Sequence, residues 1–264
     1  MSSFADLRLR VMSAVVMVTV GVFAIWLGGW LFLGLLGIAG AIMIWELARM
    51  LDASLSSTKL LLLALIGGAT IVRVGYNTQS ISLLALLLAP VIGLVLIKKG
   101  RGLFGVYGLA ILLATAGLFW LRDSEPSALG WTIWLVAVVI ASDVGGYFFG
   151  RILGGPKILP VISPKKTWSG TFGGWLLAGL IGLALVIANC ADSSLIVLSV
   201  FTAMAAQIGD IVESAVKRST GVKDSSNLIP GHGGFLDRFD ALIGASLLVL
   251  VITNTIGLPA LGGI

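Results

Sequence analysis

The sequence predicts an all-α, polytopic integral membrane protein with about nine transmembrane helices. Hydrophobic residues make up 58% of its 264 residues and charged residues only 11%, whereas soluble domains carry roughly 25% charged residues. The apolar residues form runs close to the roughly 20 residues that a helix needs to cross the hydrocarbon core of a bilayer. The chain therefore has too little polar surface to fold as a soluble globule.

Nine apolar runs have this character. They lie near residues 11–27, 30–50, 60–76, 80–97, 103–121, 130–149, 171–189, 194–213 and 239–257. The first run follows two arginines, as in a signal peptide, but no small-residue cleavage site separates it from the second, so we expect a retained helix. Without an internal repeat or a low-complexity linker, residues 1–264 are expected to form one membrane domain. Its five N-terminal helices lie in 1–128, and four helices that carry the chemistry lie in 129–264.

The basic residues predict how the helices are oriented. With nine spans, all of the 17 Lys and Arg residues except Arg73 and Arg122 fall on one side of the membrane. The positive-inside rule identifies that side as the cytoplasm, so the N-terminus is expected inside and the C-terminus outside. Because the charges lie in short clusters between apolar runs, they indicate topology and not a nucleic-acid partner.

Two long polar loops are expected on the cytoplasmic side, at residues 150–170 and 214–238, whereas the external loops are minimal. Binding and catalytic residues concentrate in such loops. Five acidic residues are expected at one depth beneath them: Asp143, Asp210, Glu213, Asp237 and Asp240. A carboxylate within a membrane is costly and usually marks a site or a partner. Pairing with a nearby Lys or Arg is an alternative explanation for any single one, and Glu46 in the second span is interpreted as structural.

This combination of residues suits a phosphate-bearing substrate and a divalent metal. Mg²⁺ usually binds through one or two carboxylates together with substrate phosphates, and Lys and Arg offset the remaining phosphate charge. The glycines of residues 231–234 offer backbone N–H groups that an anion can approach closely. A flexible turn explains the same glycines equally well when they are taken alone.

Residues 214–240 resemble the signature of the phosphatidate cytidylyltransferase family, also called CDP-diacylglycerol synthases. The matching motifs are SAVKR at 214–218, KD at 223–224 and IPGHGGFLDRFD at 229–240. The similarity extends to DVGGYFFGR at 143–151, SPKKTWSG at 163–170 and QIGD at 207–210. The N-terminal helices match only in character. Gly146 stands where Ala is usual and Ser169 where many relatives carry Glu, so we give position 169 no catalytic role.

The resemblance implies an enzyme of phospholipid biosynthesis that transfers CMP from CTP to phosphatidic acid, giving CDP-diacylglycerol and pyrophosphate. It implies a requirement for Mg²⁺, as one or two ions, allows a monovalent cation, and suggests a homodimer. We expect a multi-pass protein of a bacterial inner membrane with its active site on the cytoplasmic face. There, phosphatidic acid in the inner leaflet meets CTP from the cytoplasm, and no nucleic acid is involved.

Charge is the main obstacle in such a reaction, so catalysis is expected to come from positioning and electrostatic stabilisation. We predict that Asp210 and Asp240, with Asp237 as the next candidate, hold the metal ions that bridge the reacting phosphates. The other catalytic candidates are Lys223 and Asp224, and the weaker metal candidates are Asp143 and Glu213.

The substrate-binding residues are expected to be the polar and glycine residues of the two cytoplasmic loops. They are Ser214, Lys217, Arg218, His232, Gly233, Gly234, Arg238, Lys165 and Lys166. Ordinary anchoring of long cationic side chains at the membrane surface is an alternative for Lys165 and Lys166. His232 either donates to a phosphate or orders the glycine turn.

Two other functions stay open from the residues. A CTP-using polyprenol or phytol kinase would also combine many spans with phosphate-binding loops, but it would release CDP and not pyrophosphate. A secondary transporter for a phosphorylated metabolite also carries buried carboxylates, but near the bilayer midplane and often in broken helices of related halves. Here the polar groups gather on one side, which favours an enzyme.

Overall fold

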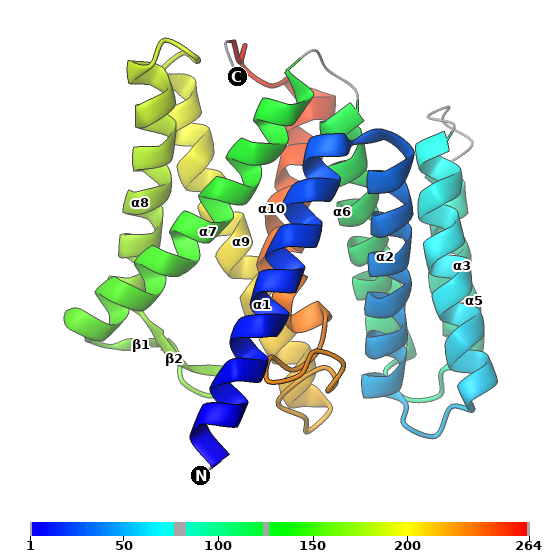
Figure 1. Cartoon of the computed structure of the whole chain (residues 1–264). Coiled ribbons are helices and arrows are strands. Elements are labelled where there is room, and N and C mark those ends of the chain that lie inside the picture. The colour runs from blue at the N-terminus through cyan, green and yellow to red at the C-terminus, as the bar shows by residue number, and fades with distance from the viewer. Residues whose placement is uncertain (1, 77–82, 124–126, 263–264) are drawn as a thin grey trace. The chain divides into compact units, whose positions relative to one another are not determined.

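A computed structural model describes residues 2–76, 83–123 and 127–262, with side chains from residue 8 onwards. The described residues are helical apart from a short hairpin and the connecting loops (Figure 1). They form two compact units. The first unit comprises Met1–Asp123 with Ser219–Phe239, and the second comprises Ser124–Arg218 with Asp240–Ile264.

The first unit is a bundle of apolar helices that carries one long polar loop. Its helices are α1 (Ser2–Leu27), α2 (Gly29–Leu51), α3 (Ser57–Tyr76), the short 3-10 helix η1 (Leu84–Leu87), α5 (Leu88–Leu96) and α6 (Arg101–Asp123). Helix α2 packs against α3 and α6, and α5 packs against the same two helices. The core of the unit lies along these contacts, where Leu47, Leu63 and Ile111 are fully buried.

A buried carboxylate fixes the C-terminal end of α2. Asp52 follows the helix and accepts hydrogen bonds from the Ser54 hydroxyl (2.5 Å) and from the backbone N–H of Lys98 (2.9 Å). These hydrogen bonds lower the pKa of Asp52 to about 2, and the bond from the Ser54 side chain has the largest effect. Because this pKa lies below the ordinary value, the carboxylate stabilises the fold above about pH 4, and the contribution is lost as the pH falls toward 2.

The second unit contains the hairpin and the remaining long helices. These are α7 (Ala128–Ile152), β1 (Lys157–Leu159), β2 (Ser163–Thr167), α8 (Trp168–Ile187), α9 (Ser194–Ser219) and α10 (Leu236–Thr255), of which α10 begins in the first unit. The two strands are antiparallel, with Lys157 opposite Thr167. Helices α7 and α8 touch through glycine, because a Cβ on Gly170 would lie 2.6 Å from the carbonyl oxygen of Gly146.

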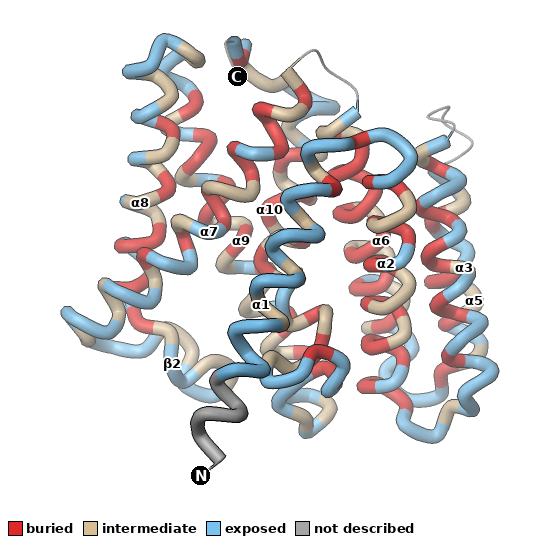
Figure 2. The backbone as a smooth tube through the Cα atoms, in the orientation of Figure 1, coloured by how far each residue is buried: buried red, intermediate tan, exposed pale blue. Residues whose placement is uncertain are grey.

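The helices support the prediction of a polytopic membrane protein. Among the described residues, α1, α2, α3, α6, α7, α8 and α9 are long and apolar enough to cross a bilayer. The fourth predicted span contains the shorter apolar helix Leu84–Leu96, and its residues 80–82 lie outside the described part. The ninth predicted span coincides largely with α10. Figure 2 shows α1 exposed along most of its described length, and its surface there is largely apolar, as lipid contact requires. The membrane class is confirmed, whereas the number nine and the orientation stay predictions.

Candidate active site

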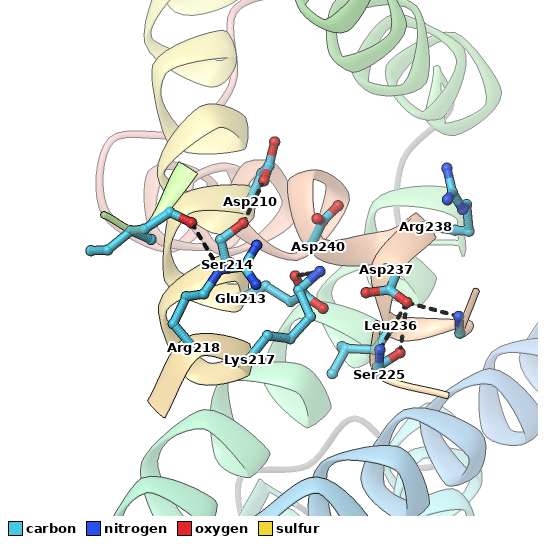
Figure 3. Close-up of polar contacts among 12 residues, drawn as sticks. Asp210, Glu213, Ser214, Lys217, Arg218, Ser225, Leu236, Asp237, Arg238 and Asp240 are labelled. Carbon is cyan, nitrogen blue, oxygen red and sulfur yellow. Dashed lines mark hydrogen bonds and ion pairs between the residues drawn. The ribbon is translucent and has the colours of Figure 1, made fainter. Parts of the chain in front are cut away.

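Three carboxylates gather in the second unit, on three different helices. Asp143 lies on α7, Asp210 on α9 and Asp240 on α10. Asp143 and Asp240 are both close enough to Asp210 for the charged groups to interact electrostatically. The structure thus brings together the two leading predicted metal ligands and one of the weaker candidates (Figure 3 shows Asp210 and Asp240).

A glycine contact between α9 and α10 produces this arrangement. A Cβ on Gly209 would lie 2.9 Å from the backbone nitrogen of Gly244 and still closer to the carbonyl oxygen of Asp240. Real Cβ atoms do not approach backbone this closely, so the two helices can cross here only because position 209 carries no side chain. The crossing places Asp210, the next residue along α9, beside the first turns of α10.

We expect Gly209→Ala to separate these helices and to lower both stability and activity. Its methyl group would meet backbone atoms, which cannot rotate away, and overpacking of this kind typically costs about 1–3 kcal/mol. Thermal unfolding in detergent and an activity assay would measure the effect. Gly21→Ala is the matched control, since a Cβ at Gly21 in α1 meets no atom within 4 Å. A Gly209→Ala protein as stable and active as the control would contradict the argument.

Cations from the hairpin and from α9 approach the carboxylates. The Lys166 ammonium on β2 forms an ion pair of 2.7 Å with Asp210, and it also donates to the carbonyl oxygen of Gln207. Lys217 pairs with the buried Glu213 one helical turn away, and its charge also acts on Asp240. Glu213, one of the weaker candidates, therefore neutralises a lysine within α9 (Figure 3).

Two further substrate-binding candidates of α9 contact groups of the same unit. The Ser214 hydroxyl donates to Asp210 over 3.3 Å, and Arg218 Nε donates to the carbonyl oxygen of Ile162 over 3.4 Å (Figure 3). The Ile162 carbonyl belongs to the hairpin turn, so Arg218 holds the hairpin against the end of α9. Both residues thus help to position Lys166 and Asp210 relative to each other.

Gln207, which was part of a matching motif but was not predicted as a site residue, connects the helices around the cluster. Gln207 accepts a hydrogen bond from the indole N–H of Trp175 on α8 (3.0 Å) and donates to the hydroxyl of Ser142 on α7 (3.2 Å). Ser142 directly precedes Asp143, and Gln207 lies two residues before Gly209. The available signal was a polar residue one helical turn before Asp210 in an otherwise apolar run.

The loop between α7 and α8 is closed by its own polar groups. The Thr167 hydroxyl accepts from the backbone N–H of Gly170 and so caps α8. Ser169 bonds to the Thr167 hydroxyl and to the carbonyl oxygen of Gly154. These contacts give Ser169 a place in the structure of the loop.

A cavity of about 550 Å³ opens within the second unit beside the carboxylate cluster. Its charged wall consists of Asp143, Asp210, Arg151, Lys157, Lys165 and Lys166. The volume is within the range of roughly 300–1,000 Å³ that is typical of small-molecule sites. Lys165 and Lys166 line it as predicted site residues, whereas Arg151 and Lys157 were not predicted, although Arg151 closes the DVGGYFFGR motif. Cations outnumber acids on this wall, as an anionic ligand requires.

The carboxylates fit a magnesium ion that is shared with substrate. Within the described part of the chain, no three His, Cys, Asp or Glu side chains converge as a complete metal site. Mg²⁺ does not require such a set, because it usually takes one or two carboxylates and completes its shell with water and substrate phosphates. Asp210 and Asp240, whose charges interact, would supply two such carboxylates.

In the first unit, Glu46 of α2 holds the signature loop. Its carboxylate is fully buried and accepts hydrogen bonds from the hydroxyls of Ser225 and Ser226 and from the backbone N–H groups of Phe235 and Leu236. The last two bonds measure 2.8 and 2.6 Å. Leu236 is the first residue of α10 and Phe235 precedes it, so Glu46 caps that helix with a negative charge, which its unpaired N–H groups favour.

Asp237 stabilises the same loop. One of its oxygens accepts hydrogen bonds from the backbone N–H groups of Gly234 (2.7 Å) and Ser225 (2.9 Å) and lies 3.1 Å from the Ser225 hydroxyl (Figure 3). Because a hydroxyl has one proton, Ser225 donates to either Asp237 or Glu46 at a given moment. The structure thus gives Asp237 a place in the loop, and its role as a metal ligand stays a prediction.

His232 and Arg238 also make contacts inside this loop. The His232 ring is hydrogen-bonded through Nδ1 to the Ser13 hydroxyl on α1 (2.8 Å). The Arg238 guanidinium donates twice to the carbonyl oxygen of His232. Gly233 has a φ of 85°, a conformation that favours glycine. These contacts favour the interpretation that His232 orders the glycine turn.

The fold and the site define a polytopic membrane protein with a cation-lined, carboxylate-bearing pocket. The model of the cytidylyltransferase family matches residues 8–256, and the chain belongs to this family. It is 43% identical over 168 residues to the phosphatidate cytidylyltransferase of Brucella suis biovar 1 (strain 1330), a stretch that covers 55% of this chain and 62% of that protein.

A second relative is more distant in sequence. The phosphatidate cytidylyltransferase of Staphylococcus saprophyticus subsp. saprophyticus is 38% identical over 138 residues, which cover 51% of this chain and 53% of that protein. The chain thus matches less than two thirds of the length of either relative. These proteins are what the chain is similar to.

Proposed function

We propose that the chain is a phosphatidate cytidylyltransferase, which transfers CMP from CTP to phosphatidic acid and releases pyrophosphate. The observation that carries the proposal is the cluster of Asp143, Asp210 and Asp240 beside a cavity lined by Lys165 and Lys166. Family membership and the names of the relatives support the choice of CTP and phosphatidic acid. The protein would lie in a bacterial inner membrane as a homodimer, with nine spans and its active site on the cytoplasmic face.

In this reaction an oxygen of the phosphatidic acid phosphate attacks the α-phosphorus of CTP. A new P–O bond forms, the bond to the β-phosphate oxygen breaks, and pyrophosphate leaves with the electron pair. A phosphate monoester has its second pKa near 6, so it is largely ionised at neutral pH and needs no strong general base. Two anions must nevertheless meet, and catalysis comes from positioning and charge stabilisation.

The cations of the cavity wall perform most of this task. Lys165, Lys166, Lys157 and Arg151 surround one cavity and offset the charge of the triphosphate. Asp210 and Asp240, with Asp143 beside them, would hold Mg²⁺ as one or two ions. When bound, Mg²⁺ supplies additional charge stabilisation to the reacting phosphates. Asp237, Lys223 and Asp224 lie in the signature loop of the first unit, and their catalytic roles stay predictions.

A single assay separates this proposal from the two rival functions. Detergent-solubilised protein is incubated with labelled CTP, with and without phosphatidic acid, and the products are resolved. We expect pyrophosphate and labelled CDP-diacylglycerol only when the lipid is present. Formation of CDP with a polyprenol or phytol acceptor would replace the proposal by a kinase. Uptake of a phosphorylated metabolite into proteoliposomes without any turnover would replace it by a transporter.

A further inference from the structure

A second cavity, of about 620 Å³, lies within the first unit. Its wall is formed on one side by the C-terminal end of α2, with Arg49, Met50 and Ala53, and on the other by the loop of residues 220–228. None of these residues lines the cavity of the carboxylate cluster. The loop belongs to the family signature, whereas Arg49 lies far from it in the sequence.

The wall of this second cavity carries unpaired positive charge. Across the described residues, neither Arg49 nor Lys223 forms an ion pair, and Asp224 is the single acidic residue of the wall. The Arg49 guanidinium lies 5.1 Å from the centre of the Trp45 ring. This cation–π contact orients the guanidinium without neutralising it. Two cations and one carboxylate on the wall of one cavity favour an anionic ligand.

Backbone donors of the same loop are also available. The N–H groups of Val222, Lys223 and Asp224 make no hydrogen bond to any described residue, and the same holds for Asn227. Free N–H groups on a turn are a common means of binding phosphate. The loop is held against α2, because the hydroxyls of Ser225 and Ser226 donate hydrogen bonds to Glu46.

We propose that this cavity binds a phosphate group, with Arg49 and Lys223 as its charged ligands. The planar fork of Arg49 suits bidentate contact with phosphate oxygens, which a lysine cannot reproduce. The cavity is larger than a phosphate ion and accommodates the group that bears it. Two compounds of the proposed reaction carry such a phosphate, namely CTP and the headgroup of phosphatidic acid. The choice of these ligands rests on the proposed function, whereas their binding requires no turnover.

The experiment compares Arg49→Gln with Lys59→Gln in the full-length protein. Lys59 is an exposed cation in the first turn of α3 and does not line the cavity, so its replacement removes the same charge elsewhere in the same unit. One arm measures equilibrium binding of labelled CTP to protein in phosphatidylcholine nanodiscs. The other measures binding of short-chain phosphatidic acid to protein in detergent. Both variants are first checked for wild-type thermal unfolding.

We expect Arg49→Gln to lower the binding affinity for one of the two ligands by about tenfold or more, as the loss of a charge-assisted hydrogen bond predicts. Lys59→Gln should leave both affinities within about twofold, as expected for an exposed charge. Arg49→Lys should fall between Arg49→Gln and the wild type. Weaker CTP binding identifies the nucleotide as the occupant, and weaker phosphatidic acid binding identifies the lipid headgroup. Equal affinities in Arg49→Gln and Lys59→Gln would overturn the inference. A wild type that binds but does not turn over would refute the proposed function alone.

Discussion

Glu46→Ala is expected to destabilise the first unit by at least about 3 kcal/mol and to abolish CMP transfer. Three donors, the Ser226 hydroxyl and the backbone N–H groups of Phe235 and Leu236, lose their acceptor at a fully buried position, whereas the Ser225 hydroxyl can still donate to Asp237. Each buried donor left without a partner costs about 1–3 kcal/mol. The loop would then leave α2, and α10 would lose the charge that caps its first turn.

Glu46→Gln tests the same contacts more gently. The amide keeps one acceptor oxygen but places an NH₂ group against donors, so we expect an intermediate loss of stability. Thermal unfolding in detergent and limited proteolysis of residues 219–239 would report on the loop directly. Asp123→Ala removes an exposed carboxylate at the end of α6 and serves as the control. Wild-type stability and protease resistance in Glu46→Gln would contradict the role assigned to Glu46.

Asp210→Asn and Asp240→Asn are each expected to lower the rate of CMP transfer by at least about 100-fold, a typical loss when one electrostatic group of an active site is removed. The change keeps the size of each side chain and removes one of two adjacent negative charges. We also expect the variants to need more Mg²⁺ for half-maximal activity, which a purely structural role would not produce. The Mg²⁺ titration is therefore measured with the rate.

Asp192→Asn is the control for both substitutions. Asp192 is an exposed residue of the connection before α9, and its substitution removes the same charge. Each variant is compared with the wild type by its insertion into the membrane and its thermal unfolding. Near-normal rates in both Asp210→Asn and Asp240→Asn, with unchanged Mg²⁺ dependence, would exclude the proposed metal site.

The helices were predictable from the sequence because their cause is local. A run of about 20 apolar residues has few alternatives to a membrane helix, and each of the nine predicted runs contains a helix within the described residues. The gathering of Asp143, Asp210 and Asp240 was also within reach, since equal depth in a bundle places polar residues near one another. Membership of the cytidylyltransferase family confirms the resemblance that the motifs carried.

The contacts of individual carboxylates were not predictable. Asp237 and Asp240 are three residues apart, but one belongs to the first unit, where it binds loop N–H groups, and the other to the second. Glu46 was interpreted as structural, yet its partners lie 179 to 190 residues away in the chain. No sequence period links residues so distant. The hairpin of β1 and β2 was expected only as a polar loop, because its strands are short and rich in lysine and proline.

The wide separation of Glu46 from its donors has a consequence for biosynthesis. Ser225 is added 179 residues after Glu46, and Leu236 is added 190 residues after it. At roughly 5–20 residues per second this interval lasts about 10 to 40 s. During that time α2 is already made, while the groups that will donate hydrogen bonds to its Glu46 carboxylate have not yet been synthesised. The first unit therefore completes its assembly only late in translation, and a nascent chain that stops before residue 219 leaves a helix with an unsatisfied acid for quality-control proteases to recognise.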